Sequence, residues 1–356
     1  MRLLVIGGTG WLGGCVVATA VRRGDDVTTL TRGIARRTAP SPTGVHALVA
    51  DRSSPAYVTA ALAGRRFDAV VDTAGYTVAG VRTTAAHLAD VGHYAFVSSI
   101  SAYRDWPPGP ITGTGDPTFG SERVVGPDAD PDADAEPEGY GPMKAECERV
   151  LEGVLGDRLL IARPGLIIGP GDPTGRLGWW LRRIARGGDV VVPASNLEVP
   201  VAFVDVRDLA DWLVDSAHRR AGGVVNATGD AGMTTYGGLL ETARAVIGDD
   251  VERPVRWVPL DDDTLVAAGA QEWTHLPFWL AADAARTAWQ VDATSARAAG
   301  LASRPIAETL RDTWSWLRTV PSAAGSAPAT GGGRPAFGLP PAIEGALLEG
   351  ARPGGV

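Results

Sequence analysis

The sequence predicts an α/β protein built on a doubly wound parallel sheet, with a second, smaller domain. Two observations predict the sheet: short apolar runs alternate with helical stretches through the first half of the chain, and a glycine-rich turn follows the first run at once. A third predicts the second domain, because this alternation stops where most of the tryptophans lie. We therefore expect a sheet domain at 1–165 plus about 201–229, a smaller domain at 166–200 plus 230–318, and a flexible tail at 319–356.

Each element follows from the local sequence. Residues 2–6 form an apolar run typical of a buried parallel strand, and a helical stretch at 14–23 follows the glycines. Further strands are expected at 26–31, 45–49, 69–72, 94–98, 159–162 and 224–227, with helices at 81–91 and 140–155 between them. Residues 304–318 form an amphipathic helix, with Ile306, Leu310, Trp314 and Leu317 on one face. Past Thr319 only Ile343–Leu348 is expected to dock, as one helical turn.

The turn after the first strand reads Gly7-Gly8-Thr9-Gly10-Trp11-Leu12-Gly13. Its glycines fit G-x-G-x-x-G from Gly8 and G-x-x-G-x-x-G from Gly7. Glycine is needed where the backbone turns tightly and a pyrophosphate approaches a helix N-terminus, whose free N–H groups favour anions. A glycine-rich turn without a ligand is the alternative. The position between a strand and a helix favours a dinucleotide site.

Lys144 is the only lysine in a combined Lys+Arg total of 33. The chain therefore uses arginine almost wherever it needs a positive charge. The one lysine that it keeps is expected to do what a guanidinium cannot, because its ammonium is a compact point charge. It follows Tyr140, one of six tyrosines, by four residues, so a helix would place both side chains on one face. An ammonium there favours the phenolate. The pair is predicted to act as a general acid/base, and a surface lysine that escaped the bias is the alternative.

Composition excludes several classes of function. The net charge of -8 and pI of about 5.2 give no electrostatic support to a nucleic-acid or membrane role. The first apolar run is too short for a signal peptide and no stretch approaches a membrane span, so we expect a cytoplasmic protein. Cys15 and Cys147 are expected to be small buried apolar residues, and the five histidines show no metal-ligand spacing. Residues 104–138, with many aspartates, are expected to form a mobile solvated loop rather than a metal site.

Several motifs together resemble the extended short-chain dehydrogenase/reductase superfamily, in particular its NAD-dependent epimerase/dehydratase group. In family order from residue 1 to about 230, they are Gly7–Gly13, Val71–Gly75, Phe96–Tyr103, Tyr140–Lys144, Arg163–Gly165 and Phe203–Ala210. The Thr-Arg-Gly after the second strand and the closing segment 273–280 look more like actinobacterial reductase-like members than sugar epimerases. The resemblance implies a Rossmann fold, an NAD(P)-dependent enzyme and a substrate-binding second domain.

The resemblance also implies roles for single residues. Tyr140 would be the acid/base, Lys144 would hold the nicotinamide ribose, and Ser99 would hydrogen-bond the reacting oxygen, with Ser101 as runner-up. Asp51 and Arg52 fall where the family contacts adenine. The other expected cofactor-site residues are Gly7, Thr9, Gly10, Trp11, Leu12 and Gly13 at the turn, Thr73, Ala74 and Gly75 under the cofactor, Ser98 as a brace at the strand end, and Pro164, Gly165 and Leu166 beside the nicotinamide.

The end of the second strand bears on the choice of cofactor. An NAD site usually places Asp or Glu there, but this chain has Thr31, followed by Arg32 and then by Arg36 and Arg37. Arginine suits a 2′-phosphate, so NADP(H) is favoured, with NAD(H) possible. The alternative is that these arginines are solvated loop charges.

Three functions remain open. The leading one is an NAD(P)-dependent oxidoreductase acting on a ketone or alcohol of a small substrate, possibly secondary-metabolic. The second is a nucleotide-sugar epimerase or dehydratase with bound NAD, for which Arg176, Arg182 and Arg207 are the candidates to grip a diphosphate. The third is a non-catalytic dinucleotide-binding regulator, against which the Ser99, Tyr140 and Lys144 set argues. The expected partner is a small molecule, for a monomer or homodimer.

Overall fold

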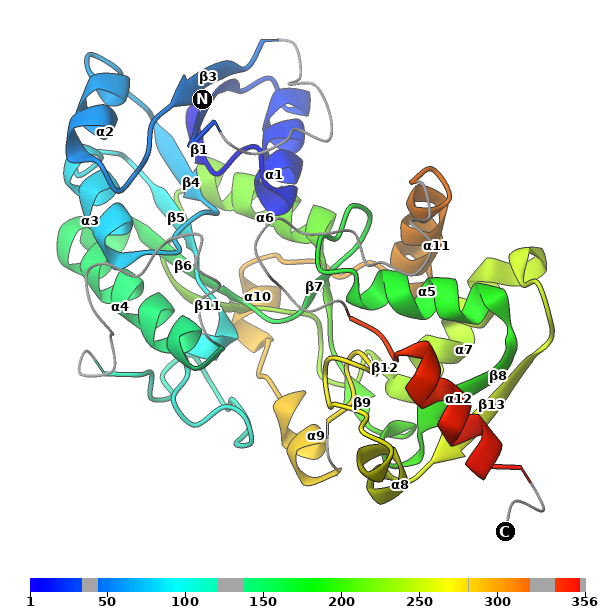
Figure 1. Cartoon of the computed structure of the whole chain (residues 1–356). Coiled ribbons are helices and arrows are strands. Elements are labelled where there is room, and N and C mark those ends of the chain that lie inside the picture. Colours follow the sequence, from blue (N-terminus) through cyan, green and yellow to red (C-terminus); the bar gives the residue numbers. More distant parts are fainter. Residues whose placement is uncertain (34–43, 121–136, 281, 321–336, 353–356) are drawn as a thin grey trace.

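The fold centres on a seven-stranded sheet, seen in a computed structural model that describes residues 1–33, 44–120, 137–280, 282–320 and 337–352 (Figure 1). The strand order is β11-β6-β5-β4-β1-β2-β3, and every neighbouring pair is parallel. The strands are β1 (Arg2–Ile6), β2 (Asp26–Thr31), β3 (His46–Val49), β4 (Ala69–Asp72), β5 (Tyr94–Val97), β6 (Leu159–Pro164) and β11 (Gly223–Ala227). The predicted doubly wound sheet is therefore confirmed.

Both faces of the sheet are covered by helices because its strands are apolar on both sides. In β1, Leu3 and Val5 enter one core and Leu4 and Ile6 enter the other. The first core is completed by α1 (Trp11–Arg22) and α6 (Val206–Arg219). The second is completed by α2 (Pro55–Leu62), α3 (Val78–His87) and α4 (Pro137–Leu155). Successive side chains of a strand point to opposite faces of the sheet. A continuous apolar run therefore contributes to a core on each face.

The order of the strands decides where a ligand would bind. β1 lies between β4 and β2, so the chain goes to opposite sides of β1 for its later strands. In open α/β sheets ligands bind outside the carboxyl ends of the strands at such a reversal. The glycine turn leaves β1 at this edge, and the loops after β4, β5 and β6 open onto the same edge.

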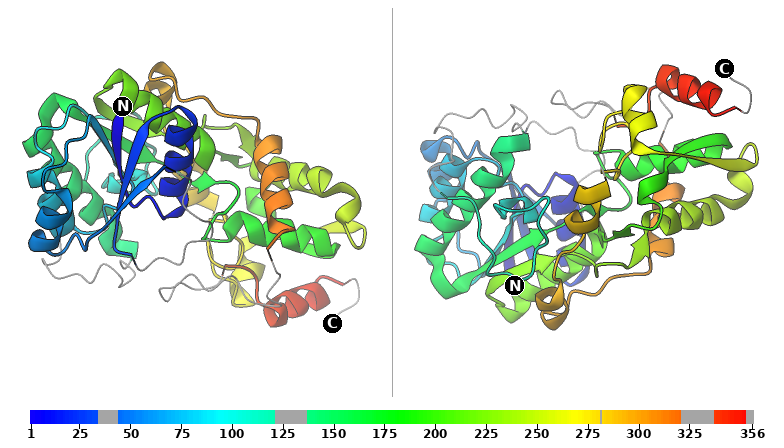
Figure 2. Two further views of the ribbon diagram at one scale, coloured as in Figure 1. Left: turned by 90° about the horizontal axis from the view of Figure 1, so that it is seen from above. Right: turned by 90° about the horizontal axis from the view of Figure 1, so that it is seen from below.

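Much of the chain after β6, apart from α6 and β11, builds a second lobe with its own core (Figure 2). β8 (Gly188–Pro193) pairs in parallel with β13 (Val255–Leu260), although more than sixty residues separate them. Three helices pack against each other here: α5 (Arg176–Arg186), α7 (Tyr236–Ile247) and α11 (Ile306–Leu317). Smaller elements complete the lobe and its connections: β7 (Ile167–Ile168), β9 (Pro200–Val201), β10 (Val204–Asp205), β12 (Thr234–Thr235), α8 (Asp262–Ala267), α9 (Ala282–Ala288) and α10 (Thr294–Ala298).

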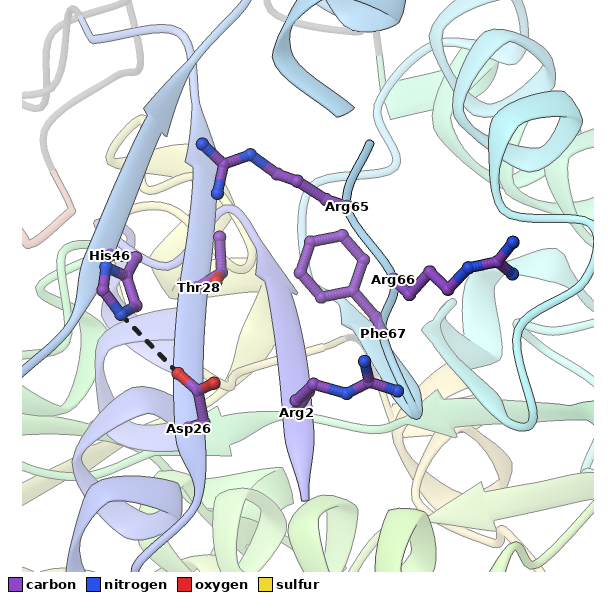
Figure 3. A pocket seen from close by; sticks show the side chains of 7 residues that line it. All are labelled: Arg2, Asp26, Thr28, His46, Arg65, Arg66 and Phe67. Carbon is purple, nitrogen blue, oxygen red and sulfur yellow. Dashed lines mark ion pairs between the residues drawn. The ribbon is translucent and has the colours of Figure 1, made fainter. Parts of the chain in front are cut away.

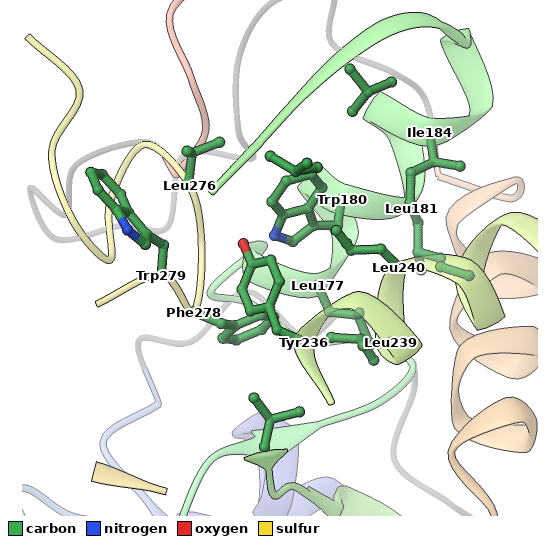
Figure 4. Close-up of a cluster of buried hydrophobic side chains, with 14 of the residues drawn as sticks. Leu177, Trp180, Leu181, Ile184, Tyr236, Leu239, Leu240, Leu276, Phe278 and Trp279 are labelled. Atoms are coloured by element: carbon green, nitrogen blue, oxygen red, sulfur yellow. The ribbon is translucent and has the colours of Figure 1, made fainter. Parts of the chain in front are cut away.

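Aromatic side chains fill much of the second core (Figure 4). The Trp180 and Tyr236 rings meet edge to face with centroids 6.0 Å apart. The Trp180 indole and the Tyr236 hydroxyl both donate to the carbonyl of Pro277, at 2.9 and 3.1 Å. These hydrogen bonds satisfy the polar tips of two fully buried rings, which is how Trp and Tyr are accommodated in an apolar core.

The end of the chain differs from the expected flexible tail. Within the described residues 337–352, α12 (Pro341–Gly350) is a ten-residue helix against β8, longer than the single turn expected at Ile343–Leu348. Leu339 and Leu347 are buried in the second core, and Glu344 accepts from Arg183 at 2.6 Å. The short run Ile343–Leu348 was the only signal for this helix in the sequence. The strand that it packs against, β8, lies about 150 residues earlier in the chain.

The acidic loop is only partly described. Its most acidic run, Pro127–Asp134, lies outside the described residues. The described part from Arg104 onward is held by the rest of the protein: Tyr103 and Thr118 form an antiparallel bridge, and Ile111 exchanges backbone hydrogen bonds with Gln290 and Asp292.

Candidate active site

The glycine turn is shaped by close backbone contacts. Gly7 has φ +83°, a conformation that side chains rarely adopt, and a Cβ at Gly13 would overlap the Gly7 carbonyl oxygen. α1 begins at Trp11, with Gly10 as its N-cap; no side chain caps it, and its first turn carries no acidic residue. The N-terminus of α1 thus offers its dipole and backbone N–H groups without a competing carboxylate. These features fit a bound pyrophosphate.

The loop after β4 runs directly beside this turn. Thr73 donates its hydroxyl to the carbonyl of Ile6 at 3.0 Å. A Cβ on Gly7 would lie 2.7 Å from the Cβ of Ala74, and one on Gly75 would overlap the Phe96 ring. The structure thus brings the predicted residues Thr73, Ala74 and Gly75 to the same edge as the glycine turn.

Arg52 does not reach out toward an adenine as the sequence predicts. Its guanidinium turns inward and forms a two-pronged pair with the fully buried Asp72, at 3.0 and 2.7 Å. It also donates to the carbonyl of Ala74 at 2.9 Å, while Asp72 accepts from the Ala74 N–H at 3.0 Å. Both backbone groups of Ala74 are therefore held by one ion pair. Arg52 thus holds the start of the loop after β4 in place, because a buried carboxylate needs a charged partner.

Lys144 is buried beside this loop. Its side chain is 2% exposed and donates to the carbonyl of Val97, at the end of β5, at 3.1 Å. The ammonium lies 5.6 Å from the Tyr140 ring centroid, 4.9 Å from that of Tyr76 and 5.2 Å from that of Phe96. A buried cation surrounded by ring faces is stabilised by their quadrupoles. The position excludes the alternative of a surface lysine.

Ser99 and Tyr140 come from elements in direct contact. Ser99 caps the short helix Ile100–Ala102, accepting from the Ser101 N–H and donating to the Ser101 hydroxyl, both at 3.1 Å. A Cβ on Gly141 would overlap the carbonyl of Ser101. Glycine at this position therefore lets the start of α4 pack on the turn that carries both serines. Tyr140 and the serine pair are brought together by that contact.

A buried ion pair anchors the next turn of α4. Glu148 follows Lys144 by four residues and accepts from Arg163 of β6 at 3.0 and 2.6 Å. The Ser98 hydroxyl donates to the same carboxylate. Ser98 thus braces the strand end, as expected, and its hydroxyl is directed to Glu148. Together these contacts set the rotation of α4, and with it the direction of Tyr140 and Lys144.

The segment after β6 links the two lobes at this edge. Gly165 lies against Thr228 and Ile100, and the carbonyl of Leu166 accepts from the Val204 N–H at 3.0 Å. From the glycine turn, the Trp11 indole donates to the carbonyl of Pro170 at 2.7 Å. The predicted residues Pro164, Gly165 and Leu166 thus lie where the lobes join, and Trp11 contacts the same segment at Pro170.

The adenosine end of the site is described in part. Thr31 is half-buried at the end of β2 and Arg32 is exposed. Hydrogen bonds from Ser53 hold the pKa of Asp51 below its usual value, and the charge of Arg32 acts in the same direction. Arg36 and Arg37 lie outside the described residues.

The arginines expected to grip a diphosphate are not gathered at one place. Arg207 is paired with Asp205 at 2.8 Å and also with Asp312. The Arg176 guanidinium stacks over Trp273 and Phe337, at 5.4 and 4.8 Å from the ring centroids. Burial lowers the pKa of Arg182 on α5. Arg207 is thus occupied by structural partners, and Arg176 stacks beside the described end of the chain.

Tyr76 was not among the residues predicted from the sequence. This side chain directly follows Gly75, is half-exposed, and its ring is the nearest of the three around the Lys144 ammonium. The sequence feature that could have identified Tyr76 is the run Ala74-Gly75-Tyr76 directly after a buried strand, because the carboxyl end of that strand faces the candidate site.

Within the described residues, no group of three or more His, Cys, Asp or Glu side chains is placed to hold a metal ion. None of the helices in the described ranges is long and apolar enough to cross a membrane.

Comparisons with known proteins agree with this geometry. The model of the NAD dependent epimerase/dehydratase family matches residues 3–227. A search of curated proteins found no match.

Solved structures with the same fold match this chain over both of its lobes. The Bordetella bronchiseptica enzyme WbmH, solved with NAD⁺, is 16% identical, with 89% of this chain and 98% of that chain covered and a TM-score of 0.64. WbmG of the same organism, solved with NAD and UDP, is 15% identical, with 90% and 95% covered and a TM-score of 0.63. The Thermus thermophilus UDP-glucose 4-epimerase, solved with NAD, is 19% identical, with 90% and 100% covered and a TM-score of 0.61. The chain belongs to the NAD-dependent epimerase/dehydratase family.

Proposed function

We propose that this enzyme is an NAD(P)-dependent oxidoreductase that interconverts a ketone and an alcohol on a small substrate. The observation that carries the proposal is the buried ammonium of Lys144 beside the Tyr140 ring, on a helix packed against the turn of Ser99 and Ser101. A bound nicotinamide would supply the hydride acceptor or donor. Gly7–Gly13 would hold its pyrophosphate, Thr73–Gly75 would pass beneath it, and Pro164–Leu166 would lie beside the nicotinamide.

The residues of the chain handle the proton and the oxygen. Tyr140 would exchange a proton with the substrate oxygen through its hydroxyl, and Ser99, assisted by Ser101, would donate a hydrogen bond to that oxygen. Lys144 would favour the phenolate through its charge and would donate to the nicotinamide ribose. Its bond to the Val97 carbonyl uses one of three N–H donors, which leaves two for these partners.

A nucleotide-sugar epimerase or dehydratase is the second candidate. Its support is that WbmG was solved with NAD and UDP, and that three other neighbours are UDP-glucose 4-epimerases. Against it stands Arg207, one of the arginines expected to grip a diphosphate, which is already paired with Asp205 and Asp312. Denaturing the purified protein and identifying the released molecules separates the two: an epimerase keeps its nucleotide bound through turnover, whereas an oxidoreductase exchanges it.

Replacing the acid/base tests the mechanism. Tyr140→Phe keeps the ring and removes the transferable proton, so turnover should fall by about two to four orders of magnitude while cofactor binding persists. Lys144→Arg keeps the charge but should also lose activity, because a planar guanidinium cannot take the ammonium's place between the rings and the Val97 carbonyl. Near-normal turnover by Tyr140→Phe on the substrate would refute this assignment.

Cofactor choice is a separate proposal. We expect NADPH to bind more tightly than NADH, with Arg32 beside the 2′-phosphate, because a charge-assisted hydrogen bond is worth about 1.5–3 kcal/mol, or about one to two orders of magnitude in Kd. Arg32→Ala should lose most of this preference and hardly change NADH binding. Titration of both cofactors at one salt concentration tests whether NADPH binds more tightly than NADH. Equal affinities in the wild type would make Arg32 a loop charge.

A further inference from the structure

Four aromatic side chains meet on one side of the second core. Phe203 directly precedes β10, Trp273 and Phe278 lie in the segment after α8, and Trp289 follows α9. In five pairs of these rings the centroids lie 5.1–6.4 Å apart. Phe203, Phe278 and Trp289 are buried, whereas Trp273 is partly exposed. We call these four residues the aromatic cluster, and Trp273 is its outer member.

One side of the cluster adjoins the predicted nicotinamide position. A Cβ at Gly229 would lie 2.2 Å from the carbonyl oxygen of Phe203. Thr228, the residue before Gly229, touches Gly165 in the same way, because a Cβ at Gly165 would lie 2.6 Å from its Oγ1. Gly165 is expected beside the nicotinamide. Two close contacts therefore connect that position to the cluster.

The segment that carries Trp289 is also held by the loop that follows Ser99. From this loop, Ile111 donates its N–H to the carbonyl of Gln290 at 2.9 Å. The carbonyl of Ile111 accepts from the N–H of Asp292 at 2.8 Å. The cluster is thus connected to the serine turn as well as to the strand end beside the nicotinamide.

Trp289 carries a buried donor that has no hydrogen-bond partner. The residue is 6% exposed, and among the described residues nothing accepts from its indole N–H. The indoles of Trp180, Trp212 and Trp279, which are equally buried, each donate to a carbonyl or carboxylate oxygen at 2.9–3.0 Å. Buried Trp N–H groups usually have such a partner, so the exception indicates an acceptor from outside the chain.

The backbone of the cluster is a second, independent signal. Trp273 has φ +63° and Phe278 has φ +73°, and Arg220 is the only other non-glycine residue of the described ranges with a positive φ. The left-handed region is strained for a bulky side chain. Such strain persists where the surrounding structure holds a side chain in place for a function, as at ligand-binding positions.

A depression of about 230 Å³ lies at the amino ends of β1, β2 and β3 (Figure 3). Polar side chains border it, among them Asp26 and His46, which the dashed line joins. β1 runs from Arg2, at this depression, to Ile6, directly before the glycine turn. The depression is therefore at the opposite end of the sheet from the cofactor edge, and a substrate bound there would not reach Tyr140.

We propose that the aromatic cluster is the substrate subsite of the oxidoreductase proposed above, and that the substrate is a ketone or alcohol attached to an aromatic ring with an oxygen substituent. The proposal rests on that function. The ring of the substrate packs against Trp273, and its substituent oxygen accepts from the N–H of Trp289. This N–H is covered in the structure, so binding includes a shift of Trp273, the outer member of the cluster.

The composition of the cluster favours this class of substrate over a sugar. Its four rings offer apolar surface and, within the described residues, one unpaired donor. Subsites of this kind bind a largely apolar group, which a small number of polar contacts orient. A sugar has a hydroxyl on nearly every carbon, and each one would need a polar partner when buried.

Binding of simple ketones to the full-length protein, saturated with NADP⁺, tests the subsite without any need for turnover. 4-Methoxyacetophenone has the acceptor oxygen, acetophenone lacks it, and cyclohexyl methyl ketone also lacks the aromatic ring. Ligand-observed NMR should give a Kd of about 1–10 mM for the first, as expected for its size. Acetophenone should bind about 2- to 10-fold more weakly, the range for one neutral hydrogen bond. Cyclohexyl methyl ketone should bind more weakly still, because it cannot stack.

Three variants locate the contacts. Trp289→Phe should remove the preference for 4-methoxyacetophenone and leave acetophenone within about twofold of its wild-type affinity. Trp273→Ala should weaken both aromatic ketones by about fivefold or more, because it removes a ring face. Trp180→Phe is the matched control: it removes another buried indole N–H from the second core and should keep the preference. Thermal unfolding should show that all three variants are folded.

The outcomes separate the subsite from the proposed reaction. An unchanged preference in Trp289→Phe, or no wild-type binding at about 20 mM of either aromatic ketone, would overturn the subsite. In the reaction, the bound ketone takes a hydride at carbon from NADPH and a proton at oxygen from Tyr140, giving the alcohol and NADP⁺. The expected binding pattern without this reduction would refute the oxidoreductase function and leave the subsite standing. Reduction of all three ketones with equal kcat/KM would refute the subsite and leave the function standing.

Discussion

At the scale of single residues, the environment of Lys144 is formed by the rings around it. Tyr76 and Tyr140 come from different elements, one from the loop after β4 and the other from α4, and both face the Lys144 ammonium. Tyr140 has a predicted proton-transfer role, while Tyr76 is half-exposed at the same edge. We infer that Tyr76 holds the ammonium through its ring face and borders the cofactor site.

Two substitutions of Tyr76 distinguish the contribution of its ring to cofactor binding from that of its hydroxyl. A cation–π contact contributes about 0.5–2 kcal/mol, so Tyr76→Ala should weaken cofactor binding about 2- to 30-fold, whereas Tyr76→Phe should bind within about twofold of the wild type. Fluorescence titration measures both. Tyr57→Ala is the control, because Tyr57 is an exposed tyrosine on α2, outside the ring cluster. Wild-type affinity in Tyr76→Ala would remove this role.

At the scale of elements, buried ion pairs connect the loops that carry the site. Arg52, from the loop before α2, holds Asp72 and Ala74 at the end of β4, and the Tyr94 hydroxyl of β5 donates to Asp72 at 2.8 Å. Burial raises the pKa of Tyr94 well above its usual value, so the phenol remains a donor. Groups from the loop before α2, from the loop after β4 and from β5 thus meet at one carboxylate.

Removal of Arg52 should therefore cost stability. Arg52→Met leaves the Asp72 carboxylate buried without its cation, so the free energy of unfolding should fall by about 3–5 kcal/mol. Arg256→Met breaks the exposed pair with Asp189 and should hardly change the free energy of unfolding, because exposed ion pairs contribute little. Urea unfolding of both variants measures the difference. Similar small losses in the two would show that the buried pair is worth no more than a surface pair.

At the scale of the whole molecule, the second lobe is closed by residues from distant parts of the chain. α12 packs on β8, its Leu347 and the preceding Leu339 are buried in the second core, and Arg183 of α5 pairs with Glu344. Arg183 is almost fully buried, so Glu344 supplies the charge that its guanidinium needs. The described end of the chain is thus part of the lobe.

Truncation after Val320 tests this contribution. It removes two buried leucines, each worth about 1.5–3 kcal/mol, and leaves Arg183 without its carboxylate. The Tm should fall by more than about 5 °C, since 1 kcal/mol corresponds to about 2–4 °C in domains of 150–250 residues. Truncation after Arg352 keeps α12 and is the control. A shared Tm for the two truncated proteins would mean that α12 adds nothing to the lobe.

The sequence by itself determined the sheet and most of the candidate site. β1, β2 and β4 begin and end where they were predicted, because apolar runs and the turns that follow them are local properties of the chain. Tyr140 and Lys144 were predicted from their spacing within one short motif, and Ser99 from the resemblance of its motif to the family. A parallel sheet collects the motifs that follow its strands at one edge.

Tertiary structure decided what depends on partners distant in sequence. The inward turn of Arg52 follows from Asp72, a carboxylate twenty residues away that needs a cation, and no pattern around Arg52 records that need. The pairing of β8 with β13 and the length of α12 likewise depend on surfaces that exist only once the lobe has formed. Local periodicity predicts which face of an element is apolar, but the partner for that face, or for a buried charge, is chosen by the assembled fold.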